Sequence, residues 1–192
     1  MLRPLLAALV ALCSAVGCSQ DGLVLSGVVG GAYYAPQYDW DEFFAVTDGR
    51  NFQVILSGNP FPAISDADFR REFLPVLQAA KPRPNLTFTY EPPPELPRPY
   101  YRVVLIFNAA NDLNADRVCA GQIQHKQPTR PFDLYAIYCR NELPLSYTTA
   151  WTEATGPDDP RVMALMAQVF LVLFPEPLLF GRGPRGFGAR RW

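Results

Sequence analysis

The sequence is poor in the residues that bind metals and carry out nucleophilic catalysis. It contains one histidine, His125, and four cysteines, Cys13, Cys18, Cys119 and Cys139, with no C-x-x-C pair among them. A structural zinc site takes four cysteine or histidine ligands, usually in closely spaced pairs, so the sequence predicts no such site. The common serine-hydrolase, metalloprotease, P-loop and dinucleotide-binding motifs are also missing. We therefore expect no catalytic residues, no bound metal and no cofactor.

Charged residues are scarce as well, at 18% of the 192 residues, whereas 49% are hydrophobic and 20 residues are prolines. The apolar share is enough for one packed core, and the length beyond residue 17 suits a single domain. Between residues 18 and 180, 12 basic and 18 acidic side chains give a net charge of −6. An acidic body repels nucleic acid, so we expect no nucleic-acid partner.

Residues 1–17 have the pattern of an export signal. Arg3 supplies a positive charge, the stretch 4–16 is apolar, and small residues precede Cys18. With a cysteine at the first mature position, the segment resembles the lipobox of bacterial lipoproteins, although Ala15 stands where that family prefers leucine. Two alternatives remain open. An ordinary signal peptidase would leave a soluble secreted protein, and an uncleaved segment would act as an anchor.

The resemblance implies that Cys18 is acylated on sulfur and anchors the mature chain in membrane lipid. Ser19 follows the cysteine, and in the lipoprotein sorting pattern it resembles the residue of outer-membrane lipoproteins, whereas aspartate would indicate inner-membrane retention. We therefore expect a bacterial cell-envelope protein that faces the periplasm from the outer membrane rather than the inner one. A soluble periplasmic protein is the alternative.

The remaining cysteines predict a disulfide. Cleavage of the signal removes Cys13 and acylation occupies Cys18, which leaves Cys119 and Cys139 as an even pair in an oxidising compartment. Two independent buried thiols are the alternative.

The body of the chain predicts an α+β fold. Its order, β-α-β-β-β-α, favours a small, mainly antiparallel sheet with two helices on one face. Apolar and alternating runs mark the strands, and the helices begin at the capping residues Ser65 and Asp159. The strands are expected at 52–56, 86–90, 101–108 and 132–139, with 148–152 as an added edge strand, and the helices at 66–80 and 162–174.

We divide the mature chain into a tether and aromatic segment at 18–45, a single domain at 46–178 and a disordered basic tail at 179–192. Within the first segment, the Gly-rich residues 21–36 are either a tether or a first edge strand. The tail has four arginines and no acidic residue after position 180, a composition that adheres to anionic lipid headgroups. The element order is similar to that of several small outer-membrane lipoproteins that act as assembly partners, including the family that supports lipopolysaccharide export. That similarity implies a non-catalytic lipoprotein that binds or scaffolds another envelope component.

The aromatic segment offers a possible ligand site. Tyr33, Tyr34, Tyr38 and Trp40 are interleaved with carboxylates, and exposed rings beside hydroxyl-binding carboxylates suit a cell-wall glycan. The competing interpretation is that these rings pack over the core. An unrecognised periplasmic hydrolase, with carboxylates brought together by the fold, is a further alternative.

One segment resembles the start of a calcium-binding loop but lacks two of the residues that such a loop requires. Asp112, Asn114 and Asp116 stand at alternate positions, as in the start of an EF-hand loop. Arg117 stands where that loop needs glycine, and Ile123 where it needs glutamate. The segment therefore predicts a turn rather than a metal site.

Overall fold

The computed structural model of the chain describes residues 27–94, 97 and 99–176. The predicted signal segment 1–17, the predicted lipidation site Cys18 and the predicted basic tail 179–192 lie outside the described residues. Within the described ranges, no helix is both long enough and apolar enough to cross a membrane.

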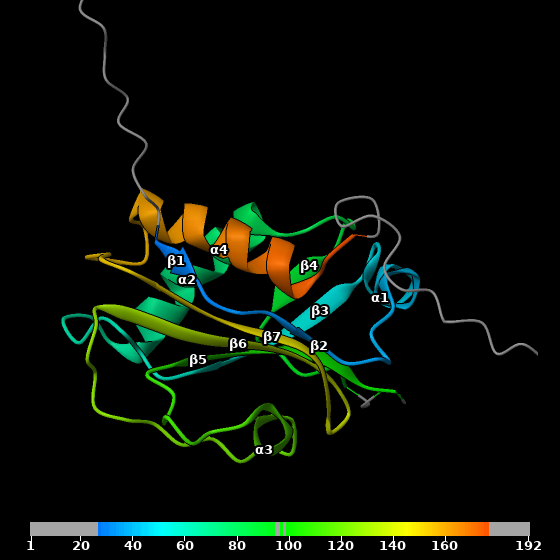
Figure 1. The fold of residues 1–192 in the computed structure, drawn as a ribbon. Coiled ribbons are helices and arrows are strands. Elements are labelled where there is room, and N and C mark those ends of the chain that lie inside the picture. The colour runs from blue at the N-terminus through cyan, green and yellow to red at the C-terminus, as the bar shows by residue number, and fades with distance from the viewer. Residues whose placement is uncertain (1–26, 95–96, 98, 177–192) are drawn as a thin grey trace, which may run out of the picture.

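One seven-stranded sheet forms the centre of the fold (Figure 1). Its order is β1-β7-β6-β5-β3-β4, and β2 pairs with β7 farther along the same strand. β3 is parallel to β4 and β5, and the other pairs are antiparallel, which confirms the α+β class and the mainly antiparallel sheet. The strands are β1 (Val28–Val29), β2 (Tyr33–Tyr34), β3 (Asn51–Ser57), β4 (Thr87–Thr89), β5 (Tyr101–Phe107), β6 (Phe132–Arg140) and β7 (Leu143–Thr152).

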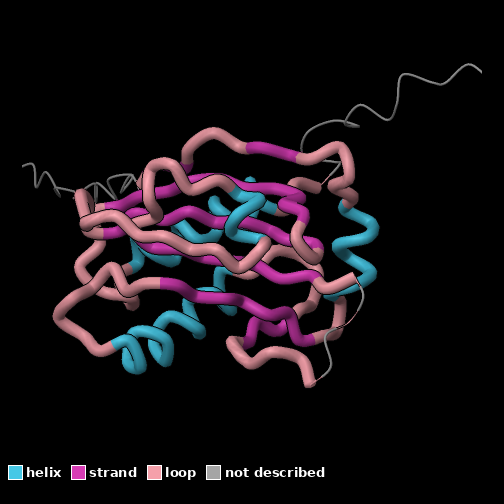
Figure 2. Tube along the Cα trace, turned by 90° about the horizontal axis from the view of Figure 1, so that it is seen from below, coloured by secondary structure: helices cyan, strands magenta, loops and turns pink. Residues whose placement is uncertain are grey.

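Helices cover the two faces of this sheet unequally. The two longer helices, α2 (Asp66–Ala80) and α4 (Pro160–Leu173), pack against each other on one face, as the sequence predicts. The short α3 (Ala115–Cys119) lies on the other face, and α1 (Trp40–Thr47) lies at one end of the sheet (Figure 1). Figure 2, seen from below, shows the strands running side by side with α3 and its flanking loops in front of them.

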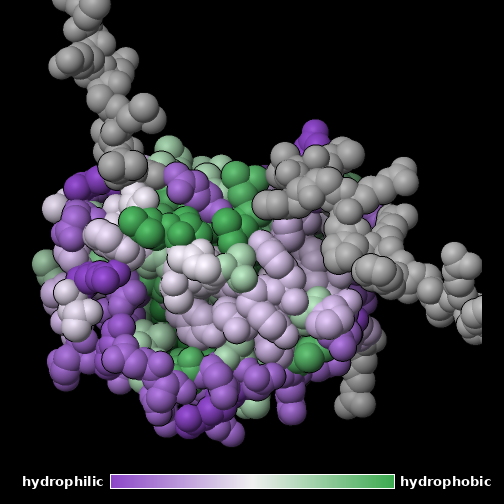
Figure 3. Space-filling view, viewed as in Figure 1, coloured by the Kyte–Doolittle hydropathy of each residue, from purple (hydrophilic) through white to green (hydrophobic). Residues whose placement is uncertain are grey.

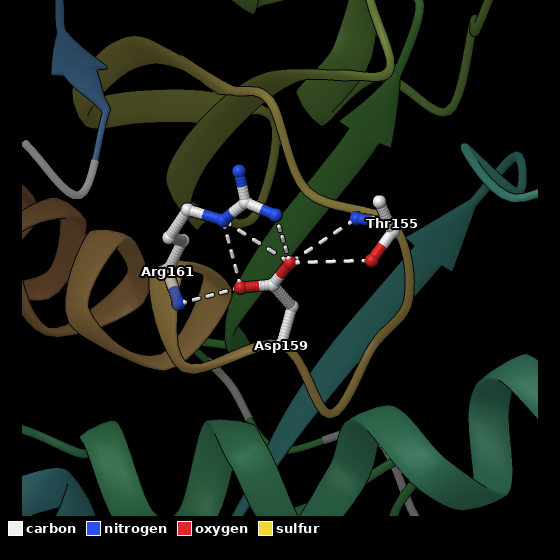
Figure 4. Close-up of polar contacts among 3 residues, drawn as sticks. All are labelled: Thr155, Asp159 and Arg161. Atoms are coloured by element: carbon white, nitrogen blue, oxygen red, sulfur yellow. Dashed lines mark hydrogen bonds and ion pairs between the residues drawn. The ribbon is translucent and has the colours of Figure 1, made fainter. Parts of the chain in front are cut away.

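Local chemistry determines where the longer helices begin. Ser65 accepts a hydrogen bond from the backbone N–H of Asp68 at 3.1 Å, which satisfies one of the free donors of α2. Asp159 does the same for α4, because its carboxylate accepts from the N–H of Arg161 at 2.9 Å and from the N–H of Thr155 at 3.2 Å (Figure 4). Side-chain hydrogen bonds from Arg161 hold the pKa of Asp159 far below its ordinary value.

The helix-covered face carries the main hydrophobic core. Alternate residues of the strands point into it, and phenylalanine rings from the strands and from α1, α2 and α4 pack against one another there. Phe43 of α1 stacks on Phe174 with ring centroids 4.2 Å apart, and Phe107 of β5 meets Phe132 edge-on at 4.9 Å. β5 is buried along its whole length because both of its faces are covered.

A smaller cluster fills the opposite face beneath α3. The predicted disulfide joins Cys119 at the end of α3 to Cys139 of β6, with the Cα atoms 5.7 Å apart. Arg102 of β5, only 8% exposed, donates to the carbonyl of Cys119 at 2.6 Å. The disulfide and this hydrogen bond therefore attach the long connection between β5 and β6 to the sheet at α3.

The structure differs in detail from the expected element order. Part of the segment expected as a tether at 18–45 belongs to the sheet, because β1 and β2 pair with β7 and α1 continues beyond position 45. The added strand expected at 148–152 is the second half of β7, and it is not an edge strand because β1 covers it. α2 has the expected bounds and remains one continuous helix through Pro75.

Candidate functional site

The best candidate site lies on the sheet face that the two long helices do not cover. α3 and its flanking loops cover this face over β5, β6 and part of β7. The rest of the outer side of β7, and that of β2, is less covered, and the side chains that point outward there include tyrosines. We call the site formed by Tyr33, Tyr135, Tyr147 and the start of α3 the tyrosine cleft.

Three tyrosines from three strands meet in the tyrosine cleft. Tyr33 pairs with Tyr147 in the β2–β7 register, and their rings stack with centroids 4.7 Å apart and 17° between the planes. Tyr135 of β6 meets Tyr147 edge-on at 5.8 Å. Tyr33 is 43% exposed, and the other two are half-buried. Such amphipathic rings offer flat apolar faces and hydroxyl donors to the same partner.

The surface is hollowed on both sides of Tyr135 and Tyr147. One hollow of about 390 Å³ lies toward the start of α3 and the β6–β7 hairpin, and a second of about 330 Å³ lies toward the β5–β6 connection. Both are in the range of small-ligand pockets. Their shared lining is Leu113, Tyr135 and Tyr147. Figure 3 shows a pale, weakly polar surface where Figure 1 places the β7 and β2 edge of the sheet.

Polar groups line the rims of these hollows. Lys126 forms an ion pair with Asp133 at 2.9 Å and donates to Asn111 at 3.2 Å, so its positive charge is locally balanced. Asp116 lines the first hollow, and burial, with Tyr147 and Asp116 as lesser causes, raises the pKa of Tyr135 to about 12. The phenol of Tyr135 therefore stays protonated at neutral pH and can donate a hydrogen bond.

The structure does not bring the four predicted ligand-contact rings into one surface. Successive strand residues point to opposite faces, so Tyr33 enters the tyrosine cleft while Tyr34 turns toward α4, where its hydroxyl donates to the carbonyl of Val172 at 2.7 Å. Tyr38 is half-buried beside Tyr138, and Trp40 packs on Phe43. Tyr38 and Trp40 therefore pack against the core, which was the competing interpretation, whereas Tyr34 stays partly exposed on the side of α4.

Sequence reasoning did not identify Tyr135 and Tyr147. A signal was present, because Tyr135 stands between the inward-facing Leu134 and Ala136 of the predicted strand at 132–139. Strict alternation places such a tyrosine on the outer face. What the strand pattern does not reveal is that Tyr33, distant in sequence, stacks on that same face.

The suspected calcium motif forms a helix cap. Asn114 accepts a hydrogen bond from the N–H of Arg117 at 2.9 Å and so begins α3. In the described part of the chain, no group of three or more histidine, cysteine, aspartate or glutamate side chains could hold a metal ion.

His125 contacts the backbone of β5 and the side chain of Ser57. Its Nδ1 donates to the carbonyl of Phe107 at 2.8 Å, which leaves Nε2 as the acceptor for the hydroxyl of Ser57 at 3.0 Å. This is the direction of proton transfer that activates a serine nucleophile. The contact also fastens the β5–β6 connection to β3, and the ring lies so close to Gly58 that a Cβ there would meet it at 3.1 Å. Cys119 is engaged in its disulfide, so it is not the partner of His125.

Comparison with known proteins identifies no relative: no family model, no curated protein and no solved structure matches this chain.

Proposed function

We propose that the chain is a non-catalytic cell-envelope lipoprotein, anchored to the membrane through an acylated Cys18, whose domain binds or scaffolds another envelope component. The observation that carries the binding role is the tyrosine cleft. Tyr33, Tyr135 and Tyr147 hold one another in place by stacking and edge contacts while their outer surfaces stay accessible. Rings that are already ordered lose little conformational freedom when a partner covers them.

The disulfide supports the proposed location. Disulfides persist in oxidising compartments such as the bacterial periplasm, and the bond between Cys119 and Cys139 stabilises the connection beside the tyrosine cleft. Together with the lipobox-like residues before Cys18, it favours export to the envelope, facing the periplasm and attached to the outer membrane rather than the inner one. A soluble periplasmic protein is the alternative.

The direct test combines mass spectrometry with cross-linking in cells. The mass of the mature N-terminus should show acyl groups on Cys18, and wild-type protein should cross-link to one envelope protein in constant ratio. The Cys18→Ala variant should lose membrane attachment and most of that cross-linking, because anchoring raises the local concentration of the partners. An unmodified Cys18 would remove the anchor from the proposal, and repeated recovery of the protein alone would remove the partner.

A cell-wall glycan is the second candidate ligand, and the composition of the tyrosine cleft favours it. The hollow of about 390 Å³ is lined by three tyrosine rings together with Gln37, Asn114 and Asp116. Aromatic faces pack on the apolar faces of sugars, and amide and carboxylate oxygens accept hydroxyl hydrogen bonds. Sedimentation with purified cell-wall polymer tests this: Tyr33→Ala should lose co-sedimentation, and Tyr34→Ala, on the other face, should retain it.

A periplasmic hydrolase is the third candidate, supported by the contact between Ser57 and His125. If Ser57 is a nucleophile, a fluorophosphonate probe should label wild-type protein and leave Ser57→Ala unlabelled. Equal absence of label in both proteins would leave the contact with a structural role only.

A further inference from the structure

The outer face of α4 exposes large apolar side chains together with one polar residue, Gln168. Met163 is 46% exposed and Leu171 is 52% exposed, two turns apart on the same side of the helix. Ala164 lies exposed beside them. Figure 3 shows hydrophobic surface gathered in the upper part of this view, where Figure 1 places α4 and β1. Large exposed apolar side chains in one region indicate a surface that contacts something other than water.

The described chain begins beside α4, because β1 contacts this helix. Gly27 lies directly against α4, since a Cβ on it would meet the side chain of Leu165 at 3.1 Å. At the other end of the helix, Tyr34 is 39% exposed and donates its hydroxyl to the carbonyl of Val172. A tyrosine with one apolar face and one polar tip is typical of the membrane–water interface.

The length of the preceding chain limits how far this face can lie from the predicted anchor. Nine residue steps separate Cys18 from Gly27. Fully extended, they would span at most about 30 Å. An acylated Cys18 would therefore hold the start of the described chain, beside α4, within about 30 Å of the lipid surface.

The distribution of charge on and beyond α4 also favours contact with an anionic lipid surface. α4 carries one charged residue, Arg161, and that residue is paired with Asp159 at 2.5 Å near the start of the helix. Beyond α4, the sequence 181–192 contains four arginines and no acidic residue, in contrast to the acidic body. Arginines near an anionic leaflet are attracted to its headgroups, whereas the acidic remainder of the domain is repelled.

We propose that the outer face of α4, with Tyr34, rests on the interfacial region of the lipid bilayer that holds the acylated Cys18. This inference rests on the proposed lipidation and adds an orientation to it. With α4 against the lipid, the tyrosine cleft lies on the opposite face of the sheet and points into the periplasm, where an envelope component can reach it. Anchor and binding site would then act from opposite sides of one domain.

A fluorescence experiment on the full acylated protein tests this orientation. Leu171→Cys and Gln122→Cys, one exposed position on each side of the sheet, are labelled with a polarity-sensitive dye and reconstituted in vesicles of phosphatidylethanolamine and phosphatidylglycerol. The dye at position 171 should show blue-shifted emission and quenching by a lipid-borne quencher, and the dye at position 122 should show neither. The mass of the mature N-terminus is measured on the same samples.

The outcomes separate the two proposals. A missing acyl group in the mass spectrum counts against the lipidation itself. Confirmed acylation with equal emission and quenching at positions 171 and 122 overturns the orientation alone. A shift at position 171 that grows with the protein-to-lipid ratio assigns this face to a second copy of the chain, and it also overturns the membrane contact.

Discussion

The two faces of the sheet differ in what covers them and in the side chains that they present. The face beneath α2 and α4 is closed by phenylalanine and aliphatic side chains, and rings such as Phe107 and Phe132 are inaccessible to water. The face beneath α3 is closed over β5, β6 and part of β7, where a disulfide holds the cover in place. At the edge of that cover, Tyr33 and Tyr147 lie stacked at the surface.

The same strands build both faces, so the difference comes from alternate residues. In β6, Leu134 and Ala136 point to the helices while Asp133 and Tyr135 point away from them. Folding alone accounts for the first set, because apolar burial is its main driving force. It does not require aromatic rings that remain half-exposed, and this is why we assign binding to the second face.

The largest effect is expected from opening the helix-covered core. Phe107→Ala removes a ring that is 0% exposed, and such truncations cost about 3–5 kcal/mol through lost transfer energy and the cavity left behind. Tyr33→Ala on the open face is the matched control and should cost about 1 kcal/mol or less, because it removes one ring stack and little buried area. Urea unfolding followed by circular dichroism measures both. Similar losses would contradict the division of the sheet into a structural face and a binding face.

The disulfide should have the next largest effect, and a local one. The double variant Cys119→Ala, Cys139→Ala opens a loop of 20 residues, for which chain entropy predicts a loss of about 3 kcal/mol. Hydrogen exchange should accelerate mainly in α3 and the β5–β6 connection, while α2 and α4 keep most of their relative protection. Wild-type protein in reducing agent should behave like the variant. Uniform acceleration across the fold would show that the two faces are not separate units.

A smaller effect is expected at the start of α4. Asp159→Ala removes the helix cap and its bonds to Arg161 and Thr155, at a cost of about 1 kcal/mol. Because the folded-state pKa of Asp159 is lowered from 3.8, its contribution is complete above that pH. As the pH falls below 3.8 toward the folded-state pKa, the contribution is lost.

Unfolding curves measured from pH 7 down to pH 2 check this linkage. The wild-type advantage over Asp159→Ala should be constant near neutrality and shrink in acid. An advantage that stays the same across the range would show that the carboxylate is not held by these bonds.

The smallest effect on stability should accompany the largest effect on binding. Tyr147→Ala removes the central ring of the tyrosine cleft, which is half-buried at the edge of the cluster beneath α3, so the cost should be about 1 kcal/mol or less. Binding of an envelope partner or of cell-wall polymer should nevertheless fall at least about tenfold, as for an aromatic residue at the centre of an interface. Tyr34→Ala is the control for the loss of an exposed ring. Unchanged binding by Tyr147→Ala would contradict the assignment of binding to the tyrosine cleft.

The sequence was a good guide wherever structure depends on local patterns. Alternation and β-branched runs located β3, β4, β5 and β6, and the caps Ser65 and Asp159 located α2 and α4. It allowed an edge strand within residues 21–36 but did not fix the positions of β1 and β2, which have two residues each and pair only with β7. The short α1 and α3 were missed as well, since their stability comes from packing rather than from helix propensity.

The candidate site was less accessible to sequence reasoning than the fold. Trp40 was a candidate ligand-contact ring, yet it lies in a helix that Asp39 caps and it packs on Phe43. The tyrosine cleft depends on the pairing of Tyr33 with Tyr147, a register between distant segments that no local pattern encodes. The disulfide could be predicted because it followed from cysteine parity.

Position-specific photo-cross-linking in cells tests the central claim most directly. A benzophenone amino acid is placed at Tyr147 in the tyrosine cleft and, in a second strain, at Tyr34 on the other face. Both proteins keep the Cys18 anchor, so they differ only in the face that carries the probe. We predict one discrete adduct with an envelope component from position 147 and none from position 34. The same adduct at equal yield from both positions, or from position 34 alone, would contradict the assignment of binding to the tyrosine cleft.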